Sequence, residues 1–230
     1  MLIMLTLAGL LLTAGCNKNK TAATTEGAQQ TPTTETPTRP DAPTAPAAAA
    51  PALASAADIV GQPAPDFTLA DFAGNEHSLA EYTKQGKIVI VDWFDYECGA
   101  TKAYYSKKEF VDTMNTAVKN ADDIVWLSVV SSGEGKPGYD PDGNKKYMQE
   151  VGKVNPTLRD PTGMVGKKYA AKATPTVYVV GKDGKVVYSG AYDEATSGGD
   201  GPKGMNYALL AVDAARKGQM PDVTSTKPFG

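Results

Sequence analysis

Two short apolar runs place the strongest limit on the fold of this chain. The first is KIVIVDWF at residues 87–94, which lies between Gly86 and a turn-forming segment at residues 95–99. The second is IVWLSVV at residues 124–130. Both runs are too short for a buried helix and match strands that are covered on both faces. The sequence therefore predicts an α/β domain around a central sheet.

The segments around these two strands predict the other elements. Residues 64–82 have the pattern of a hairpin followed by a short helix that Ser78 caps. Apolar residues spaced by three or four predict one helix at residues 100–118, and residues 174–190 predict two strands joined by a type I′ turn at residues 183–184. Further helices are expected at residues 145–154, 164–171 and 205–216. This order gives a mixed sheet with helices on both faces.

The first quarter of the chain has a composition that a packed domain cannot use. Residues 17–57 contain no Phe, Trp or Tyr and many Pro, Thr and Ala. Such a segment buries too little apolar surface to offset the entropy lost on ordering, so we expect a disordered tether at residues 16–57 and a globular domain at residues 58–230. The net charge of -3 and a pI near 5.3, with no run of Lys and Arg, argue against a nucleic-acid partner.

The chain begins with an apolar run that ends in small residues and a cysteine. MLIMLTLAGLLLTAGC has the length of a secretory signal rather than of a membrane-spanning helix. The stretch LTAGC at residues 12–16 resembles the lipobox of a bacterial lipoprotein, which implies removal of residues 1–15 and acylation of Cys16. Thr13 stands where the family usually has Leu, and no Lys or Arg precedes Cys16. The alternatives are a plain secretory signal and a short buried apolar segment.

Cys98 is the main candidate for chemistry in the globular part. It follows the first buried strand and precedes a predicted helix. If Cys16 is acylated, Cys98 has no partner for an internal disulfide. A sulfur at the first turn of a helix lies near free backbone N–H groups that lower the thiol pKa and favour the thiolate. The alternative role for Cys98 is a small buried hydrophobe at the end of a strand.

Three segments together resemble those of proteins with the thioredoxin fold, and more closely those of the redoxin family. That family includes peroxiredoxins, of the alkyl hydroperoxide reductase and thiol-specific antioxidant type, and membrane-tethered thioredoxins. They are VGQPAPDFTLADFAGNEHSL at residues 60–79, VDWFDYECGAT at residues 91–101 and KATPTVYVVGKDGKVVYSG at residues 172–190. The resemblance implies a thioredoxin-like α/β fold with a central mixed sheet. It also implies thiol redox chemistry outside the cytoplasm, in a bacterial cell envelope, with the lipid on Cys16 holding the protein to a membrane.

Residues 91–101 match the thioredoxin motif V-D-F-W-x-x-W-C-G-P-C. By this resemblance Cys98 is the nucleophile, Asp92 is the buried acid and candidate proton acceptor, and Trp93 is a candidate substrate-binding residue. Thr101 stands where the family has its second cysteine. A lone thiolate can attack a disulfide but needs an outside thiol for release, so the expected partners are an external thiol reductant or a protein disulfide.

The segment Thr174-Pro175 matches the cis-proline of the family. The resemblance implies that the backbone beside Pro175 lies next to the cysteine and receives an extended substrate. Most bonds before proline are trans, so a cis bond here is a specific prediction.

Two other functions remain open at this point. One is a binding or adaptor module that kept the fold and lost turnover. The other is a single-cysteine thiol peroxidase, because C-G-x-T also resembles the active-site turn of thiol-type glutathione peroxidases. No cofactor and no metal are expected, since His77 is the sole histidine and the candidate calcium loop at Asp140 has Gly143 in the fourth place instead of the sixth.

Overall fold

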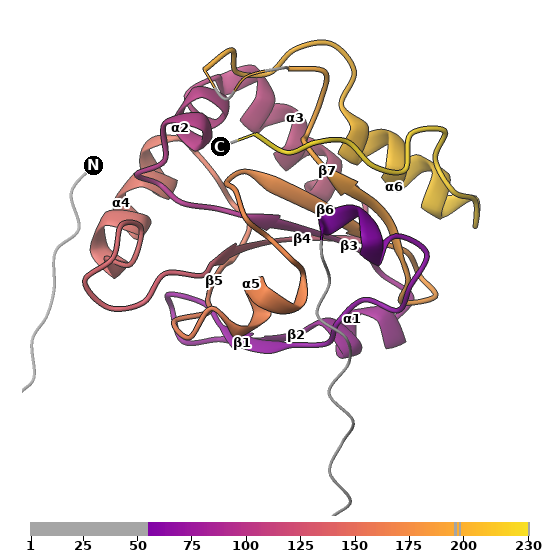
Figure 1. The fold of residues 1–230 in the computed structure, drawn as a ribbon, viewed down its shortest axis with the longest axis horizontal. Helices are drawn as coiled ribbons and strands as arrows, with labels where there is room; N and C mark the ends of the chain where they lie inside the picture. Colours follow the sequence, from indigo (N-terminus) through magenta and orange to yellow (C-terminus); the bar gives the residue numbers. More distant parts are fainter. Residues whose placement is uncertain (1–54, 196, 198, 230) are drawn as a thin grey trace, which may run out of the picture. The chain divides into compact units, whose positions relative to one another are not determined.

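The computed structural model describes residues 55–195, 197 and 199–229 (Figure 1). The predictions for the signal, Cys16 and most of the tether fall outside these residues. The elements are, in order, η1 (Ala56–Ile59), β1 (Thr68–Ala70), β2 (Glu76–Ser78), α1 (Leu79–Lys84), β3 (Ile88–Trp93), α2 (Gly99–Tyr105), α3 (Lys108–Lys119), β4 (Ile124–Val130), α4 (Pro141–Glu150), β5 (Thr157–Arg159), α5 (Met164–Lys168), β6 (Thr176–Val180), β7 (Val186–Gly190) and α6 (Tyr207–Arg216).

The main sheet is mixed, as predicted. Its strand order is β5-β4-β3-β6-β7, in which β5, β4 and β3 pair in parallel and β6 and β7 pair antiparallel to their neighbours. The two apolar runs form β3 and β4, and every residue of β3 is buried. A separate two-stranded sheet, β1-β2, is the hairpin expected near the start of the domain.

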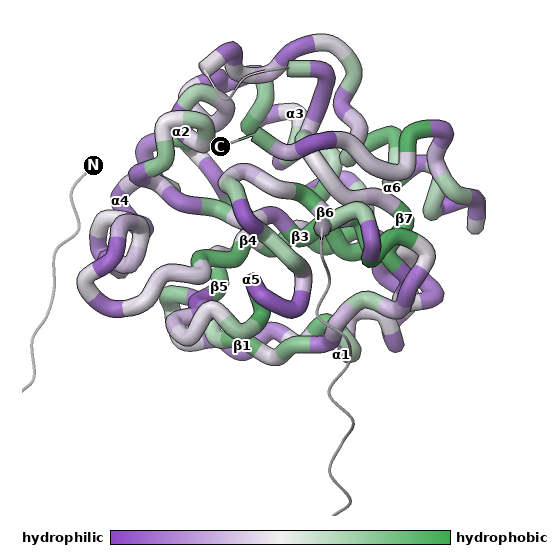
Figure 2. Tube along the Cα trace, in the orientation of Figure 1, coloured by the Kyte–Doolittle hydropathy of each residue, from purple (hydrophilic) through white to green (hydrophobic). Residues whose placement is uncertain are grey.

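Helices cover both faces of the main sheet (Figure 1). Helices α2, α3 and α6 lie on one face, where Ile88 and Ile90 of β3 join their apolar cluster. On the other face, Val89 and Val91 pack in a second cluster with residues of α1, α5 and the segment around β1. Figure 2 shows that the hydrophobic segments concentrate in the strands of the sheet. The alternation of side chains along β3 therefore builds two cores from one strand.

The single helix expected at residues 100–118 is wrong: the structure has two helices, α2 and α3, separated by Ser106 and Lys107. On a continuous helix Tyr105 and Phe110 would lie about 140° apart. Both side chains are buried in the same cluster and their rings pack at 5.6 Å. The break, with Lys107 in an extended conformation, lets both rings reach the core.

The helix expected at residues 145–154 begins earlier, at Pro141. Asp140 caps it, because its carboxylate accepts hydrogen bonds from the backbone N–H groups of Asp142 and Gly143 at 3.3 and 2.9 Å. Pro141 occupies the first helical position, where its missing N–H costs no hydrogen bond. The segment that resembles a calcium loop is therefore a helix start.

The turn between β6 and β7 is not the predicted type I′ turn. A type I′ turn needs two successive residues with positive φ, but only Gly184 has one, at 77°. The Gly184 N–H donates to the Gly181 carbonyl at 2.9 Å, and the Gly181 N–H donates to the Lys185 carbonyl at 2.8 Å. This is a three-residue loop that ends in a left-handed glycine. Strand β5 was not predicted either, because its three residues are too few to show a period.

Candidate active site

Cys98 lies directly before α2, at its N-cap position. The turn that brings the chain from β3 to this point is fixed by two hydrogen bonds of Asp95: its carboxylate accepts from the Glu97 N–H at 2.8 Å, and its carbonyl accepts from the Cys98 N–H at 3.1 Å. The Glu97 carboxylate also accepts from the Gly138 N–H at 2.6 Å. The loop before α4 therefore supports the turn that carries Cys98.

Thr174 and Pro175, more than seventy residues along the chain, meet Cys98. The Thr174-Pro175 peptide bond is cis. The Cys98 thiol donates to the Thr174 carbonyl oxygen, with 3.2 Å between sulfur and oxygen. Cys98 is half-buried, so its sulfur stays within reach of a substrate. The structure thus brings together the predicted nucleophile and the predicted substrate-binding backbone.

The surroundings of Cys98 favour its thiolate. Burial raises the pKa of the Cys98 thiol, but hydrogen bonding with the Thr174 side chain, with the backbone N–H groups of Thr101 and Ala100 and with the Thr101 side chain lowers it more. The net pKa lies below the ordinary value. The Thr174 carbonyl works in the opposite direction, because it accepts only from the protonated thiol. The Thr174 side chain and the donors at the start of α2 together outweigh burial, which favours the thiolate.

Thr101 occupies the place of the second cysteine and is fully buried. In the described part of the chain, its hydroxyl is one of four buried polar side-chain atoms with no hydrogen-bond partner. A buried hydroxyl without a partner is costly and rare in proteins. The same hydroxyl acts on the Cys98 thiol and lowers its pKa. A thiolate at Cys98 would give this hydroxyl the acceptor that it lacks.

Asp92 is buried in β3 and does not contact Cys98 by a hydrogen bond within the described residues. Its carboxylate accepts from the Tyr105 hydroxyl at 2.9 Å, from the Trp126 indole N–H at 2.8 Å and from the Ser128 hydroxyl. The residue that the motif suggests as a proton acceptor therefore already accepts three hydrogen bonds. Asp92 is linked to α2, the helix that follows Cys98, by the hydrogen bond from Tyr105.

Trp93 lies on the other side of β3 and is only 3% exposed. Its indole N–H donates to the Ser131 hydroxyl at 3.0 Å, and its ring packs against Tyr169 and Tyr178 at 5.0 and 5.3 Å. The structure places it in the core that α1 and α5 cover. It is not brought together with Cys98 and Thr174.

Sequence reasoning missed Glu97 and Gly138 as supports of the site. An added Cβ at Gly138 would lie 2.7 Å from a carboxylate oxygen of Asp95, so the loop approaches the turn as closely as glycine allows. Gly138 also has φ of 77°. A glycine in a loop gives a weak sequence signal, because the approach depends on a segment about forty residues away.

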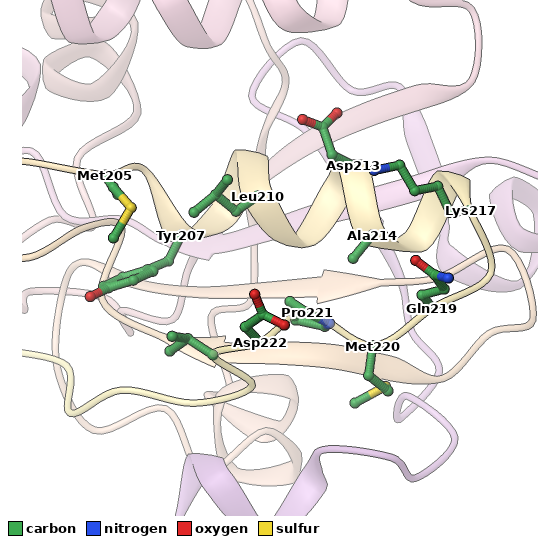
Figure 3. A pocket seen from close by; sticks show the side chains of 11 residues that line it. Met205, Tyr207, Leu210, Asp213, Ala214, Lys217, Gln219, Met220, Pro221 and Asp222 are labelled. Carbon is green, nitrogen blue, oxygen red and sulfur yellow. The ribbon is translucent and has the colours of Figure 1, made fainter.

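The structure also shows the surroundings of the other residues that the sequence singled out. In the described residues, no group of three or more His, Cys, Asp or Glu side chains is arranged to hold a metal ion. The ring nitrogens of His77 contact the Tyr82 hydroxyl at 2.7 Å and the Asp71 carboxylate at 3.3 Å. No helix in the described part of the chain is long and apolar enough to cross a membrane. A groove between α6 and the segment after it is lined by residues such as Met205, Leu210 and Met220 and has no Cys, Ser, Thr or His among its lining residues (Figure 3).

Known proteins share both this fold and parts of this sequence. Two curated relatives, each named thiol-disulfide oxidoreductase ResA, from Geobacillus thermodenitrificans and Geobacillus kaustophilus, are 28% identical over 127 residues. The match spans 55% of this chain and 66% of each relative, just under two thirds of the relative's length.

Solved structures agree with the architecture. An uncharacterized conserved protein from Geobacillus kaustophilus is 27% identical with a TM-score of 0.61 and covers 74% of this chain and 88% of its own. A hypothetical protein from Sinorhizobium meliloti 1021, 24% identical with a TM-score of 0.62, covers 74% of this chain and 92% of its own and shows the same fold. The fold is thioredoxin-like, as the sequence predicts. The family model described as Redoxin matches residues 59–207, more than half of the chain, and this protein belongs to the redoxin family.

Proposed function

We propose that this protein is a thiol-disulfide oxidoreductase that uses Cys98 as its only nucleophile. One observation carries the proposal: the Cys98 sulfur, with a lowered pKa, lies 3.2 Å from the Thr174 carbonyl beside Pro175. The relatives that are 28% identical are named as thiol-disulfide oxidoreductases, which supports the same chemistry here.

Two of the thiol-disulfide exchanges in the reaction take place at Cys98. The Cys98 thiolate attacks one sulfur of a substrate disulfide, a bond forms between the two sulfurs, and the other substrate sulfur leaves as a thiolate that takes a proton from water. Because Thr101 has no sulfur, an external thiol then attacks the mixed disulfide at the substrate sulfur. That step releases the Cys98 thiolate and leaves the substrate sulfur in a mixed disulfide with the external thiol. A second external thiol attacks this disulfide at the sulfur of the first external thiol, which frees the substrate thiol and forms a disulfide between the two external thiols. Two electrons thus pass from two external thiols to the substrate.

The residues around Cys98 have distinct roles in this scheme. The Thr101 hydroxyl donates to the Cys98 thiolate, both before attack and after release. The backbone of Thr174 aligns an extended substrate beside the sulfur. Asp92 makes no hydrogen bond to Cys98 among the described residues and acts through its hydrogen bonds with Tyr105, Trp126 and Ser128. The lipid on Cys16 and the tether at residues 16–57 would hold the domain outside the cytoplasm, within reach of disulfide substrates at the membrane.

The test uses the full chain and its C98S variant as a blank for reaction at Cys16. The rate of Cys98 alkylation is measured against pH, and the protein is then incubated with oxidised glutathione and examined by mass spectrometry. We expect a midpoint below the free-thiol value of about 8.5 and a mixed disulfide at Cys98 that added thiol releases. A midpoint at or above that value with no mixed disulfide would refute the proposal and favour an adaptor module. Faster oxidation by peroxide than by disulfide would refute it in favour of a thiol peroxidase.

A further inference from the structure

A mixed disulfide at Cys98 has no internal route of release, because Thr101 fills the position of the second sulfur. The Thr101 side chain is fully buried, and its hydroxyl has no hydrogen-bond partner within the described residues. Burial raises the pKa of the Cys98 thiol, and this hydroxyl is among the groups that lower it, so it faces the sulfur. The chain has one other cysteine, Cys16, which is the predicted site of acylation. A substrate bound to Cys98 therefore waits for a thiol that the domain itself does not supply.

A protein substrate can supply that thiol itself. When Cys98 attacks one sulfur of a protein disulfide, the other sulfur stays on the same polypeptide as a free thiolate. A group tethered by a short flexible linker acts at an effective concentration of about millimolar. A resolving cysteine beside the nucleophile would compete with this thiolate and release the substrate early. Because Thr101 has no sulfur, the freed thiolate of the substrate meets no such competitor.

Cys98 is suited to leave a mixed disulfide as well as to form one. The groups that lower its pKa against the effect of burial belong to Thr174, Thr101 and Ala100. A thiol with a lower pKa is displaced from a disulfide faster. When the Cys98 thiolate departs, it gives the Thr101 hydroxyl the acceptor that this hydroxyl lacks. The site therefore favours repeated cycles of attack and release.

The Thr174 carbonyl can hold a substrate while its disulfides rearrange. In the free protein this carbonyl accepts from the Cys98 thiol, with 3.2 Å between sulfur and oxygen. The sulfur of a mixed disulfide has no proton, so the carbonyl is then available to a backbone N–H of the bound chain. Both residues are only partly buried, so a substrate can reach them. Every residue except proline carries a backbone N–H, so this contact suits substrates of many sequences.

We propose that Cys98 also isomerises protein disulfides, and that its substrates are polypeptides with two or more wrongly paired disulfides. The proposal rests on the proposed function, because it needs Cys98 to act as a thiolate nucleophile. It goes beyond that function because no external thiol takes part. Bonds are exchanged within the substrate, and no electrons are gained or lost overall.

The isomerisation consists of three exchanges. The Cys98 thiolate attacks one sulfur of a first disulfide, forms a bond to it and displaces the second sulfur as a thiolate. That thiolate attacks a second disulfide of the same substrate, forms a new disulfide with one of its sulfurs and displaces the other. The last thiolate attacks the substrate sulfur that is bound to Cys98, completes another new disulfide and releases the Cys98 thiolate. The substrate keeps two disulfides with changed partners, and Cys98 is regenerated.

The test follows the recovery of activity by scrambled ribonuclease, whose disulfides are paired at random, with no added thiol. The parent is the full chain with Cys16→Ser, reduced beforehand, freed of reductant and used in substoichiometric amount. We expect it to restore ribonuclease activity about tenfold faster than the same chain with Cys98→Ser. Thr101→Cys adds a resolving sulfur, so it should release the substrate after one attack, form a disulfide with Cys98 and lose most of the recovery.

Lys119→Cys is the matched control for an added thiol. Lys119 is exposed at the end of α3, which leads to the start of β4, whereas Cys98 follows the end of the parallel strand β3. The added thiol therefore lies at the opposite edge of the sheet, and this variant should keep the recovery of the parent. Circular dichroism shows which variants are folded, and mass spectrometry detects the disulfide that Thr101→Cys forms.

Three results would overturn the proposal. They are recovery with the parent no faster than with Cys98→Ser, recovery only after an external thiol is added, and equal recovery with the parent and Thr101→Cys. Incubation with oxidised glutathione separates this failure from that of the proposed function. A chain that forms a mixed disulfide at Cys98, which added thiol releases, but does not restore ribonuclease is an oxidoreductase without isomerase activity. A chain that does neither has neither function.

Discussion

At the scale of the residue, Thr101 decides which steps of the proposed thiol-disulfide exchange this site can perform. Thr101 is buried at the place where a second sulfur would resolve the mixed disulfide, and its hydroxyl has no partner within the described residues. The hydroxyl cannot attack a mixed disulfide as a second thiolate would. It can donate a hydrogen bond to the Cys98 thiolate, which makes it a stabiliser of the nucleophile instead of a resolving group.

Thr101→Val should separate reactivity from stability. The change keeps the shape of the side chain and removes the hydroxyl, so the midpoint of Cys98 alkylation should rise. The free energy of unfolding should stay the same or increase by about 1 kcal/mol, because an unpartnered buried hydroxyl is lost. Denaturant unfolding and the alkylation profile measure the two quantities. A lower stability with an unchanged midpoint would show that the hydroxyl binds elsewhere.

Lys153 should leave a signature in the pH dependence of stability. Its pKa is about 7 in the folded chain and returns to about 10.4 on unfolding, so between these values the unfolded chain binds the extra proton. Stability then rises with pH, by up to about 1.4 kcal/mol per pH unit. We expect the free energy of unfolding of the parent to increase from pH 7 to about pH 9 relative to that of K153M. Parallel curves for the two proteins would contradict this expectation.

At the scale of the element, the loop before α4 and the turn after β3 form one unit. Glu97 binds the Gly138 N–H, and Gly138 approaches Asp95 so closely that no side chain fits between them. Helix α4 starts where Asp140 caps it, just after this contact. The helix start therefore fixes the loop, and the loop fixes the turn that presents Cys98.

Gly138→Ala should disturb Cys98 from a distance, and Gly135→Ala is its matched control. Both glycines have positive φ, 77° and 72°, so both substitutions carry a similar backbone penalty of roughly 1 kcal/mol. A Cβ at Gly135 meets nothing within 4 Å, whereas one at Gly138 meets Asp95. The alkylation rate of Cys98 should change in Gly138→Ala and stay near that of the parent in Gly135→Ala. Equal rates in the two variants would show that the turn does not depend on this contact.

At the scale of the whole molecule, a single central strand organises both cores and the site. Strand β3 sends alternate side chains to the two faces, buries Asp92 beneath α2 and ends at the turn that leads to Cys98. Strand β6 pairs with it and begins directly after Pro175, so the pairing register sets where Thr174 meets the sulfur. The distance between the Cys98 sulfur and the Thr174 carbonyl is thus a property of the sheet.

The lipid anchor is a prediction for the whole chain. Cys16→Ser should release the protein from the membrane fraction of the bacterium that makes it, because acylation needs the thiol. Fractionation followed by immunoblotting, with Cys98→Ser as the control that keeps the anchor, measures the result. Membrane association of the Cys16→Ser protein would argue against a lipid on this residue.

The sequence by itself determined all strands but β5, the order of most elements and the cis proline that lies beside Cys98, because these depend on local periodicity and on a motif contained in short segments. It also indicated the sheet type, since β3 and β4 are apolar apart from Asp92 and Ser128. The early start of α4 and the type of the hairpin turn depend on local residues, Asp140, Pro141 and Gly184, and were misread from the sequence. Only the tertiary structure decided the break between α2 and α3, placed Trp93 and Lys153 in the core and gave Asp92 three donors. Each of these depends on which distant side chains meet in a filled core, and no local pattern in a chain encodes such meetings.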